Sequence, residues 1–133
     1  MKVDKHWAFY NPNPKGHNKA SDCTIRAICA VTGLSWYEVF DCMVELAREN
    51  CTIPNSNSIR ADRMKLFNLK KITIPKVKKG GKRLTVKDWC EQHPTGKYVL
   101  GVSRHEVGVV NGKYYDTWCS GNHCVYSAWE LEA

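Results

Sequence analysis

The sequence predicts an α+β fold in which N-terminal helices pack on a C-terminal antiparallel β-sheet. Apolar side chains recur at helical spacing between residues 21 and 69, whereas residues 70–133 hold short apolar runs separated by turn signals. Such segregation of helices and strands along a chain is typical of α+β proteins. The 133 residues suit one domain with a modest core, preceded by an extended lead-in over residues 1–20.

The first helix is expected from about Asp22 to Thr32. The prolines in Asn11-Pro12-Asn13-Pro14 keep the preceding lead-in out of a helix, because each proline disfavours a helical residue before it. Ser21 or Asp22 is the expected N-cap, and Gly33 the C-terminal stop. The apolar face of this helix comprises Ile25, Ile28, Cys29 and either Val31 or Thr32.

The second helix has the clearest start signal in the chain. Ser35 and Glu38 form a capping box, and apolar residues follow at helical spacing until the helix ends near Asn50. These residues are Val39, Phe40, Met43, Val44 and Ala47. After a loop over residues 51–58, a short helix is expected from Ile59 to Leu69.

The remaining elements are mainly strands. We expect a short strand at Ile72–Pro75, a helix capped by Thr85 that runs to about Gln92, and a buried strand at Tyr98–Val102. Asn111-Gly112 is the strongest two-residue hairpin signal available. It joins two further strands, and a last one follows; their expected ranges are His105–Val110, Lys113–Trp118 and Val125–Trp129.

Composition favours a soluble protein. Hydrophobic residues make up 43% and charged residues 25% of the chain, and no stretch approaches the apolar length of a membrane span. The N-terminal run from Met1 to Trp7 lacks the apolar segment of a signal peptide, so we expect a cytoplasmic location. Seven cysteines are then best interpreted as mostly reduced thiols, with Cys29 and Cys42 in the core.

The net charge of +7 is concentrated between Lys70 and Arg83. Such a basic run could bind nucleic acid or an acidic partner. The other interpretation is a solvated loop, which the Gly80-Gly81 pair favours. Aromatic residues do not interleave with these lysines, so a stacking platform for single strands is not indicated.

Cys23 stands where a loop meets the start of the first helix. A helix N-terminus stabilises a nearby anion, so a cysteine there has a lowered pKa, and more so beside an imidazolium. A thiolate is the nucleophile of acyl transfer, and the backbone N–H of Cys23 is placed to donate to an oxyanion. The alternative is that Cys23 is a small buried residue facing the core.

The hairpin supplies a base for this thiol. With a two-residue turn, Val110 pairs with Lys113, and counting outward pairs Val107 with Asp116. His105 and Asp116 then lie on one face as diagonal neighbours, with Cβ atoms within about 8 Å. Asp116 would hold the tautomer of His105 and stabilise the imidazolium, as the acid of a catalytic triad does. Taken separately, His105 would be a half-exposed strand histidine and Asp116 a solvated strand-end charge.

Two neighbours of the histidine have different expected places. Glu106 points to the opposite face together with Thr117, so the register rejects it as the triad acid. Trp118 pairs with His105 across the hairpin and would shield the site from water. The other tryptophans are expected in the core or lining a cleft.

A second group of cysteines and histidines could form a zinc site. Cys119, His123 and Cys124, with Cys90 and His93 upstream, include enough ligand types for zinc, but their spacing matches no standard ribbon or finger. A loop with incidental thiols is the simpler interpretation, and a Cys119–Cys124 disulfide under oxidising conditions is a further option. We therefore expect no metal and no other cofactor.

The segment from Asp22 to Ile28, the start of the second helix and the segment from His105 to Trp118 resemble the papain-like cysteine peptidases. More closely, the chain is similar to small bacterial and phage members near the CHAP amidases and the bacteriocin-leader peptidases. The resemblance implies a papain-like domain with the triad Cys23, His105 and Asp116. Where that family has an oxyanion-donating Gln, this chain offers Asn18 or His17, of which Asn18 is the better neutral donor.

The expected function is hydrolysis of a peptide or amide bond through a thioester, with a peptide or protein as substrate and host cytoplasm as location if a phage encodes the chain. Two alternatives remain open. One is a catalytically degenerate papain-like protein that binds a host protein. The other is a basic nucleic-acid-binding protein that uses residues 70–83.

Overall fold

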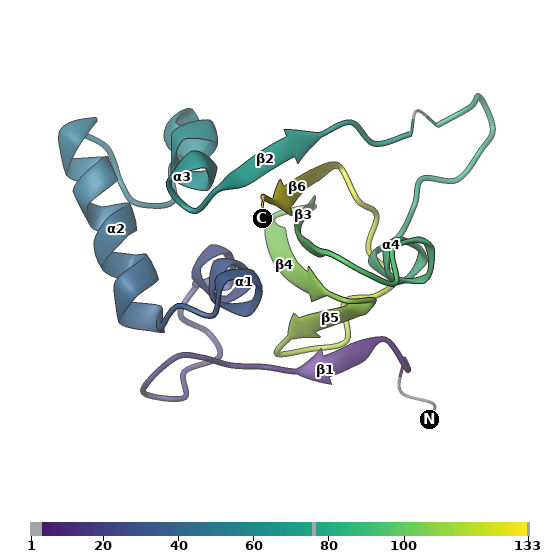
Figure 1. The fold of residues 1–133 in the computed structure, drawn as a ribbon, viewed down its shortest axis with the longest axis horizontal. Coiled ribbons are helices and arrows are strands. Elements are labelled where there is room, and N and C mark those ends of the chain that lie inside the picture. The colour runs from purple at the N-terminus through teal and green to yellow at the C-terminus, as the bar shows by residue number, and fades with distance from the viewer. Residues whose placement is uncertain (1–3, 76, 133) are drawn as a thin grey trace.

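Six strands form one mixed sheet, mostly antiparallel, and the N-terminal helices pack on it (Figure 1). The computed structural model describes residues 4–75 and 77–132. The α+β expectation is confirmed at this level. In chain order the elements are β1 (Trp7–Phe9), α1 (Cys23–Thr32), α2 (Trp36–Glu49), the 3-10 turn η1 (Asn57–Ile59), α3 (Arg60–Leu66), β2 (Leu69–Ile72), α4 (Val86–Gln92), β3 (Lys97–Val102), β4 (His105–Val110), β5 (Lys113–Asp116) and β6 (Ser127–Leu131).

The strand order is β1-β5-β4-β3-β6-β2. All neighbouring strands are antiparallel except β1, which pairs with β5 in parallel, Trp7 opposite Tyr114. The prediction of a purely antiparallel C-terminal sheet is therefore wrong at this edge. The lead-in supplies the strand because its backbone finds partners along β5, and Tyr10 N–H extends the pairing to the carbonyl of Asp116 at 3.0 Å.

Helices cover both faces of the sheet. One core joins α1, α2 and α3 to the sheet, and the other lies under α4, around the buried Trp89. Helix α1 and strand β4 approach each other closely, since a Cβ added to Gly108 would lie 2.8 Å from the carbonyl oxygen of Ala27. A glycine in this strand therefore lets the helix that begins with Cys23 sit directly on β4.

The helix starts and the hairpin agree with the sequence predictions. Ser35 and Glu38 form the predicted capping box, and Gly33 adopts the left-handed conformation that ends α1. Asn111 and Gly112 have φ of 48° and 79°, which fits the tight turn between β4 and β5. Val110 pairs with Lys113, as predicted.

Several boundaries were predicted wrongly. The third helix ends at Leu66, because Asn68 adopts a left-handed conformation with φ of 59°. The following strand is Leu69–Ile72 rather than Ile72–Pro75, because it pairs with β6, which runs from Ser127 to Leu131. The β4–β5 ladder ends at Gly108 and Tyr115, so β5 stops at Asp116. Beyond it the N–H of Thr117 donates to the Asp116 carboxylate at 2.8 Å instead of continuing the ladder.

Cys42 is exposed, which corrects its expected core position. The buried face of α2 carries Val39, Met43 and Ala47, and Cys42 lies about 100° around the helix from Met43. Cys29 is buried as predicted.

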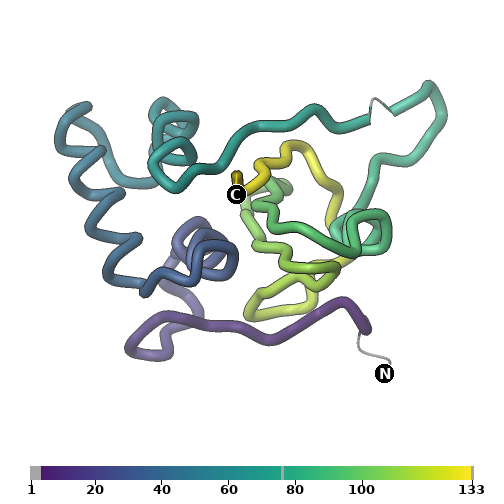
Figure 2. Tube along the Cα trace, in the orientation of Figure 1, coloured from purple at the N-terminus to yellow at the C-terminus, as the bar shows by residue number. Residues whose placement is uncertain are grey.

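The path of the basic segment is visible as the long excursion between β2 and α4 in Figure 2. Lys70, Lys71, Lys78, Lys79 and Lys82 are exposed, and Lys76 lies outside the described residues. Among the described residues no single helix is long and apolar enough to cross a membrane. The α1–α2 pair passes that test only when joined across a bend of 119°.

Candidate active site

Cys23 is the first residue of α1, and its side chain is partly buried. The N-cap residue Asp22 makes no side-chain hydrogen bond to the helix start. The first amides of α1 are thus not capped by their own flanking side chain, and the positive end of the helix dipole lies next to the sulfur. This position suits an anionic sulfur.

His105 is the first residue of β4 and contacts Asp116 at the end of β5. Its Nε2–H donates to Asp116 Oδ2 across 2.6 Å. Because Nε2 is engaged in this way, Nδ1 is the ring nitrogen left for a second partner. The side chain of His105 is 11% exposed, so the contact is shielded from bulk water.

The charge on Asp116 is held by three further groups. Ser120 Oγ–H donates to Oδ2 across 2.6 Å, and Thr117 N–H donates to Oδ1. Arg26 Nη2 lies 3.6 Å from Oδ1. The residue is 2% exposed, and a buried carboxylate needs such partners to remain ionised.

The thiol and the imidazole shift each other's titration. Burial alone would raise the pKa of Cys23, but hydrogen bonds with the His105 ring and the Glu106 backbone, together with the charge of His105, hold that pKa below its ordinary value. Burial alone would lower the pKa of His105, but hydrogen bonds and charge interactions with Asp116 and Cys23 raise it to about 9. The pair therefore favours a thiolate beside an imidazolium.

A buried chain of charges continues behind Asp116. Arg26 forms an ion pair with Asp22 one helical turn earlier. Asp22 also accepts hydrogen bonds from Trp36 Nε1 at 2.9 Å and from Asn13 Nδ2 at 3.1 Å, which lowers its pKa although burial opposes this. The lead-in, α1, α2 and β5 are thus linked through one polar network.

A cavity of about 450 Å³ opens at the sulfur. Cys23, His105, Asn18 and Trp118 all line it. The ring of Trp118 lies 5.1 Å from that of His105, centroid to centroid, and the tryptophan is 40% exposed. The structure thus gathers four of the five predicted site residues around one cavity, and Asp116 lies behind His105.

Glu106 lies on the opposite face of β4 from His105, as the register predicts. It accepts a hydrogen bond from Thr24 Oγ1 at 2.7 Å and pairs with Arg60 at 3.7 Å. It has no contact with the His105–Asp116 pair among the interactions of the described residues. The identity of the acid next to His105 therefore follows from the alternation of the strand.

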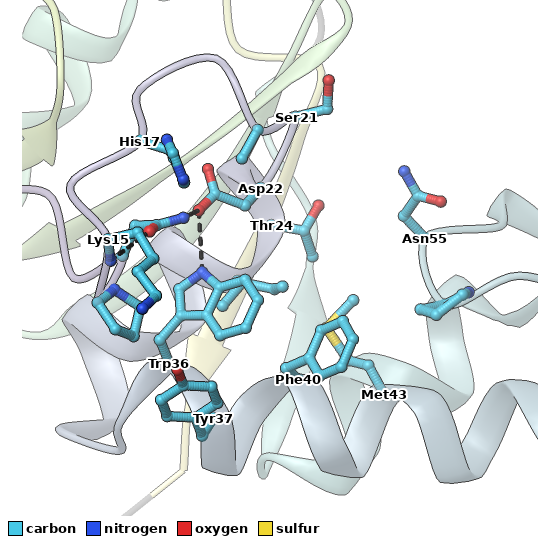
Figure 3. Close-up of a pocket in the computed structure, with 15 residues that line it drawn as sticks. Lys15, His17, Ser21, Asp22, Thr24, Trp36, Tyr37, Phe40, Met43 and Asn55 are labelled. Atoms are coloured by element: carbon cyan, nitrogen blue, oxygen red, sulfur yellow. Dashed lines mark hydrogen bonds between the residues drawn. The ribbon is translucent and has the colours of Figure 1, made fainter.

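An apolar cavity of about 430 Å³ adjoins the site on the side of α2 (Figure 3). The aromatic rings of Trp36, Tyr37 and Phe40 line it, and the dashed line in Figure 3 marks the hydrogen bond from Trp36 to Asp22. Ser21 and Asn55 line both this cavity and the one at Cys23. The two cavities therefore share a border.

The other cysteines give no metal centre. Within residues 4–75 and 77–132, no three His, Cys, Asp or Glu side chains come together in a way that would hold a metal ion. All seven cysteines are free. The Cys119 sulfur lies 3.2 Å from the Tyr114 hydroxyl, and burial raises the pKa of Cys90 to about 12.

Comparison with protein-family models, curated proteins and solved structures gives no match for this chain. Several site residues also had no place in the sequence prediction. Arg26 could have been noticed through its spacing from Asp22, which suits an ion pair on a helix. Ser120 and Asn55 carry no comparable signal, because loops bring them to the site.

Proposed function

We propose that this protein is a papain-like cysteine hydrolase that cleaves a peptide or amide bond. The observation that carries the proposal is that Cys23 and His105 line one cavity while His105 is hydrogen-bonded to the buried Asp116, with the thiol pKa lowered and the imidazole pKa raised. A thiolate at a helix start with a buried, oriented histidine is the arrangement that nucleophilic catalysis by cysteine requires.

In the proposed reaction the Cys23 thiolate attacks the carbonyl carbon, and the C–N bond of the tetrahedral intermediate then breaks. The His105 imidazolium gives its proton to the leaving amine, so a thioester and a neutral imidazole remain. Water then attacks the thioester as His105 accepts a proton from it, and the acid product leaves as the thiolate reforms. Asp116 keeps the histidine oriented in each step.

The oxyanion is assigned to the start of α1. The Cys23 N–H and the side-chain amide of Asn18 are the proposed donors, since Asn18 lines the same cavity. Asn55 lines that cavity too and is a second amide candidate. Trp118 covers His105 on the solvent side and would limit access of water.

The proposal includes a small bacterial or phage origin, a cytoplasmic location and a peptide or protein substrate. All proton transfers use groups of this chain. The basic segment has no part in the proposed reaction, because none of the lysines that the structure describes in this segment lines the cavity at Cys23.

Alkylation with iodoacetamide at pH 6 tests the proposed thiolate. Cys23 should react about tenfold or more faster than the exposed Cys42, Cys51 and Cys119, because ordinary thiols are almost fully protonated at that pH. His105→Ala should abolish the advantage, whereas Cys42→Ser should leave it intact. Equally slow labelling of all exposed thiols would contradict an activated nucleophile and favour a protein that only binds.

Turnover needs a separate measurement. With p-nitrophenyl acetate, the enzyme should acquire an acetyl group on Cys23, visible by intact mass, and then lose it. Cys23→Ser is the matched control for the nucleophile. If Cys23 is an activated thiolate but never becomes acetylated, the proposed acyl transfer is contradicted.

A further inference from the structure

We propose that the substrate carries a carboxylate beside the scissile bond, bound by an arginine-lined groove next to Cys23. This inference names the substrate class of the proposed hydrolase and therefore rests on that function. The groove encloses about 350 Å³ and has Cys23 and His105 in its lining. It lies on the β3–β4 turn side of the sulfur, and its remaining lining includes Arg60, Arg63 and Arg104.

The groove has a surplus of positive charge. Among the residues that the structure describes, Glu106 is the one carboxylate in the lining of the groove, and it pairs with Arg60 at 3.7 Å. Three guanidinium groups thus face a single acidic side chain, while the charges of Cys23 and His105 offset each other. A negatively charged group that enters the groove meets net attraction in a partly dehydrated site.

Arg63 is buried in a way that calls for an anion. It is 1% exposed, and its Nη1 donates to the carbonyl oxygens of Pro54 and Ser56, each at 3.0 Å. Burial lowers its pKa, while the charges of Glu106 and Cys23 act in the opposite sense. Its buried Nε has no hydrogen-bond partner among the described residues, and neither does that of Arg60. A buried cation with spare donors is stabilised by a further acceptor.

Arg104 has a backbone conformation that glycine or asparagine adopts more easily. It is the second residue of the turn between Val102 and His105, and its φ is 55°. Glycine or asparagine is the usual residue there, because a side chain with positive φ is strained. The turn nevertheless places an arginine in the lining of both cavities that meet at Cys23.

Arginine favours a carboxylate as the bound group. The planar guanidinium matches the two oxygens of a carboxylate and binds them with paired hydrogen bonds. A glutamate or aspartate side chain, or a C-terminal carboxylate, has the size that such a groove admits. The inferred substrate is thus an acidic peptide whose carboxylate lies within one residue of the bond cleaved.

Two alkylating probes separate this inference from the function on which it rests. The α-amides of N-bromoacetyl-glutamate and N-bromoacetyl-glutamine react with the same chemistry, but only the first carries a carboxylate, so the second is a neutral probe. We expect the acidic probe to alkylate Cys23 about tenfold faster, as a charge-assisted arginine contact implies. Raising the salt concentration should reduce the ratio, since part of the attraction is screened.

Variants identify the groups responsible. Arg104→Gln should lower the ratio of the two rates, because one of the three guanidinium groups in the groove is lost. Lys97→Gln removes the same charge at the far end of β3 and should leave the ratio unchanged. A wild-type ratio of one or less, with fast alkylation by the neutral probe, overturns the carboxylate subsite and leaves the hydrolase. Slow alkylation by both probes overturns both.

Discussion

Replacement of Asp116 by asparagine isolates the role of the buried acid. His105 has a pKa of about 9 against an ordinary 6.5, and this difference corresponds to about 3 kcal/mol of preference for the imidazolium. Burial opposes the shift, whereas Asp116 and Cys23 produce it together. In Asp116→Asn the contribution of the charged carboxylate is lost, so the pKa of His105 should fall by about one unit or more.

The assay is an NMR titration of the His105 ring protons, combined with the rate of Cys23 alkylation against pH. In the variant the imidazolium is lost at lower pH, so the change in alkylation rate that accompanies its deprotonation should occur about one pH unit lower than in the wild type. Glu106→Gln removes a neighbouring carboxylate on the other face of β4 and should leave the His105 midpoint in place. An unchanged midpoint in Asp116→Asn would refute the assigned cause of the shift.

Asp116→Asn should also change how the stability of the protein depends on pH. The folded pKa of His105 lies above its ordinary value, so its protonation stabilises the native state fully below pH 6.5, and this contribution disappears as the pH rises to about 9. Urea unfolding at several pH values should show wild-type stability falling over that interval, apart from other titrations. Asp116→Asn should flatten this fall, while Glu106→Gln should retain it.

Three further predictions concern the fold and its neighbouring groups. Gly108→Ala should destabilise the protein by about 1–3 kcal/mol in urea unfolding, since the new Cβ would lie 2.8 Å from the Ala27 carbonyl oxygen and force α1 away from β4. An unaltered midpoint of urea unfolding would contradict this close approach. Trp36→Phe keeps an aromatic ring but removes the donor to Asp22, so about 1 kcal/mol or more of stability should be lost, whereas Tyr37→Phe at an exposed ring should cost almost nothing. Joint replacement of Lys78, Lys79 and Lys82 by Gln should leave the rate of Cys23 alkylation unchanged, because these exposed lysines lie outside the cavities at the sulfur. A slower rate would show that the basic segment acts on the site.

The local signals in the sequence determined much of the fold. Capping boxes, the Asn111-Gly112 turn and alternation along His105–Val110 act over a few residues, so they could be interpreted without tertiary information. Strand β1 could not, since its three residues are held by pairing with β5 more than a hundred positions away along the chain. The end of the β5 ladder depends on a side-chain contact of Asp116, which no periodicity reports.

In the candidate site, too, local sequence signals predicted some features and only the tertiary structure supplied the others. The proximity of His105 and Asp116 followed from hairpin register, and their hydrogen bond lies on the predicted face. The groups that hold the acid did not follow, because Ser120 comes from a loop and Arg26 is buried by contacts from several elements. Arg60, Arg63 and Arg104 are ordinary surface residue types in the sequence, and only the fold brings them beside one sulfur.

The ion pairs of Arg26 connect the position of the proposed nucleophile, Cys23, to the position of the proposed base, His105. Arg26 lies in the same helix as Cys23, and its guanidinium contacts Asp22 at the helix start and Asp116 on the sheet. Rotation or sliding of α1 relative to β5 would therefore separate a buried cation from one of its anions, which is costly in a dry interior. The small contact surface at Gly108 restricts the same movement through packing. The relative position of the thiol and the imidazole is thus fixed by interactions that involve neither of them. The proposed catalytic pair would need such support to keep its geometry.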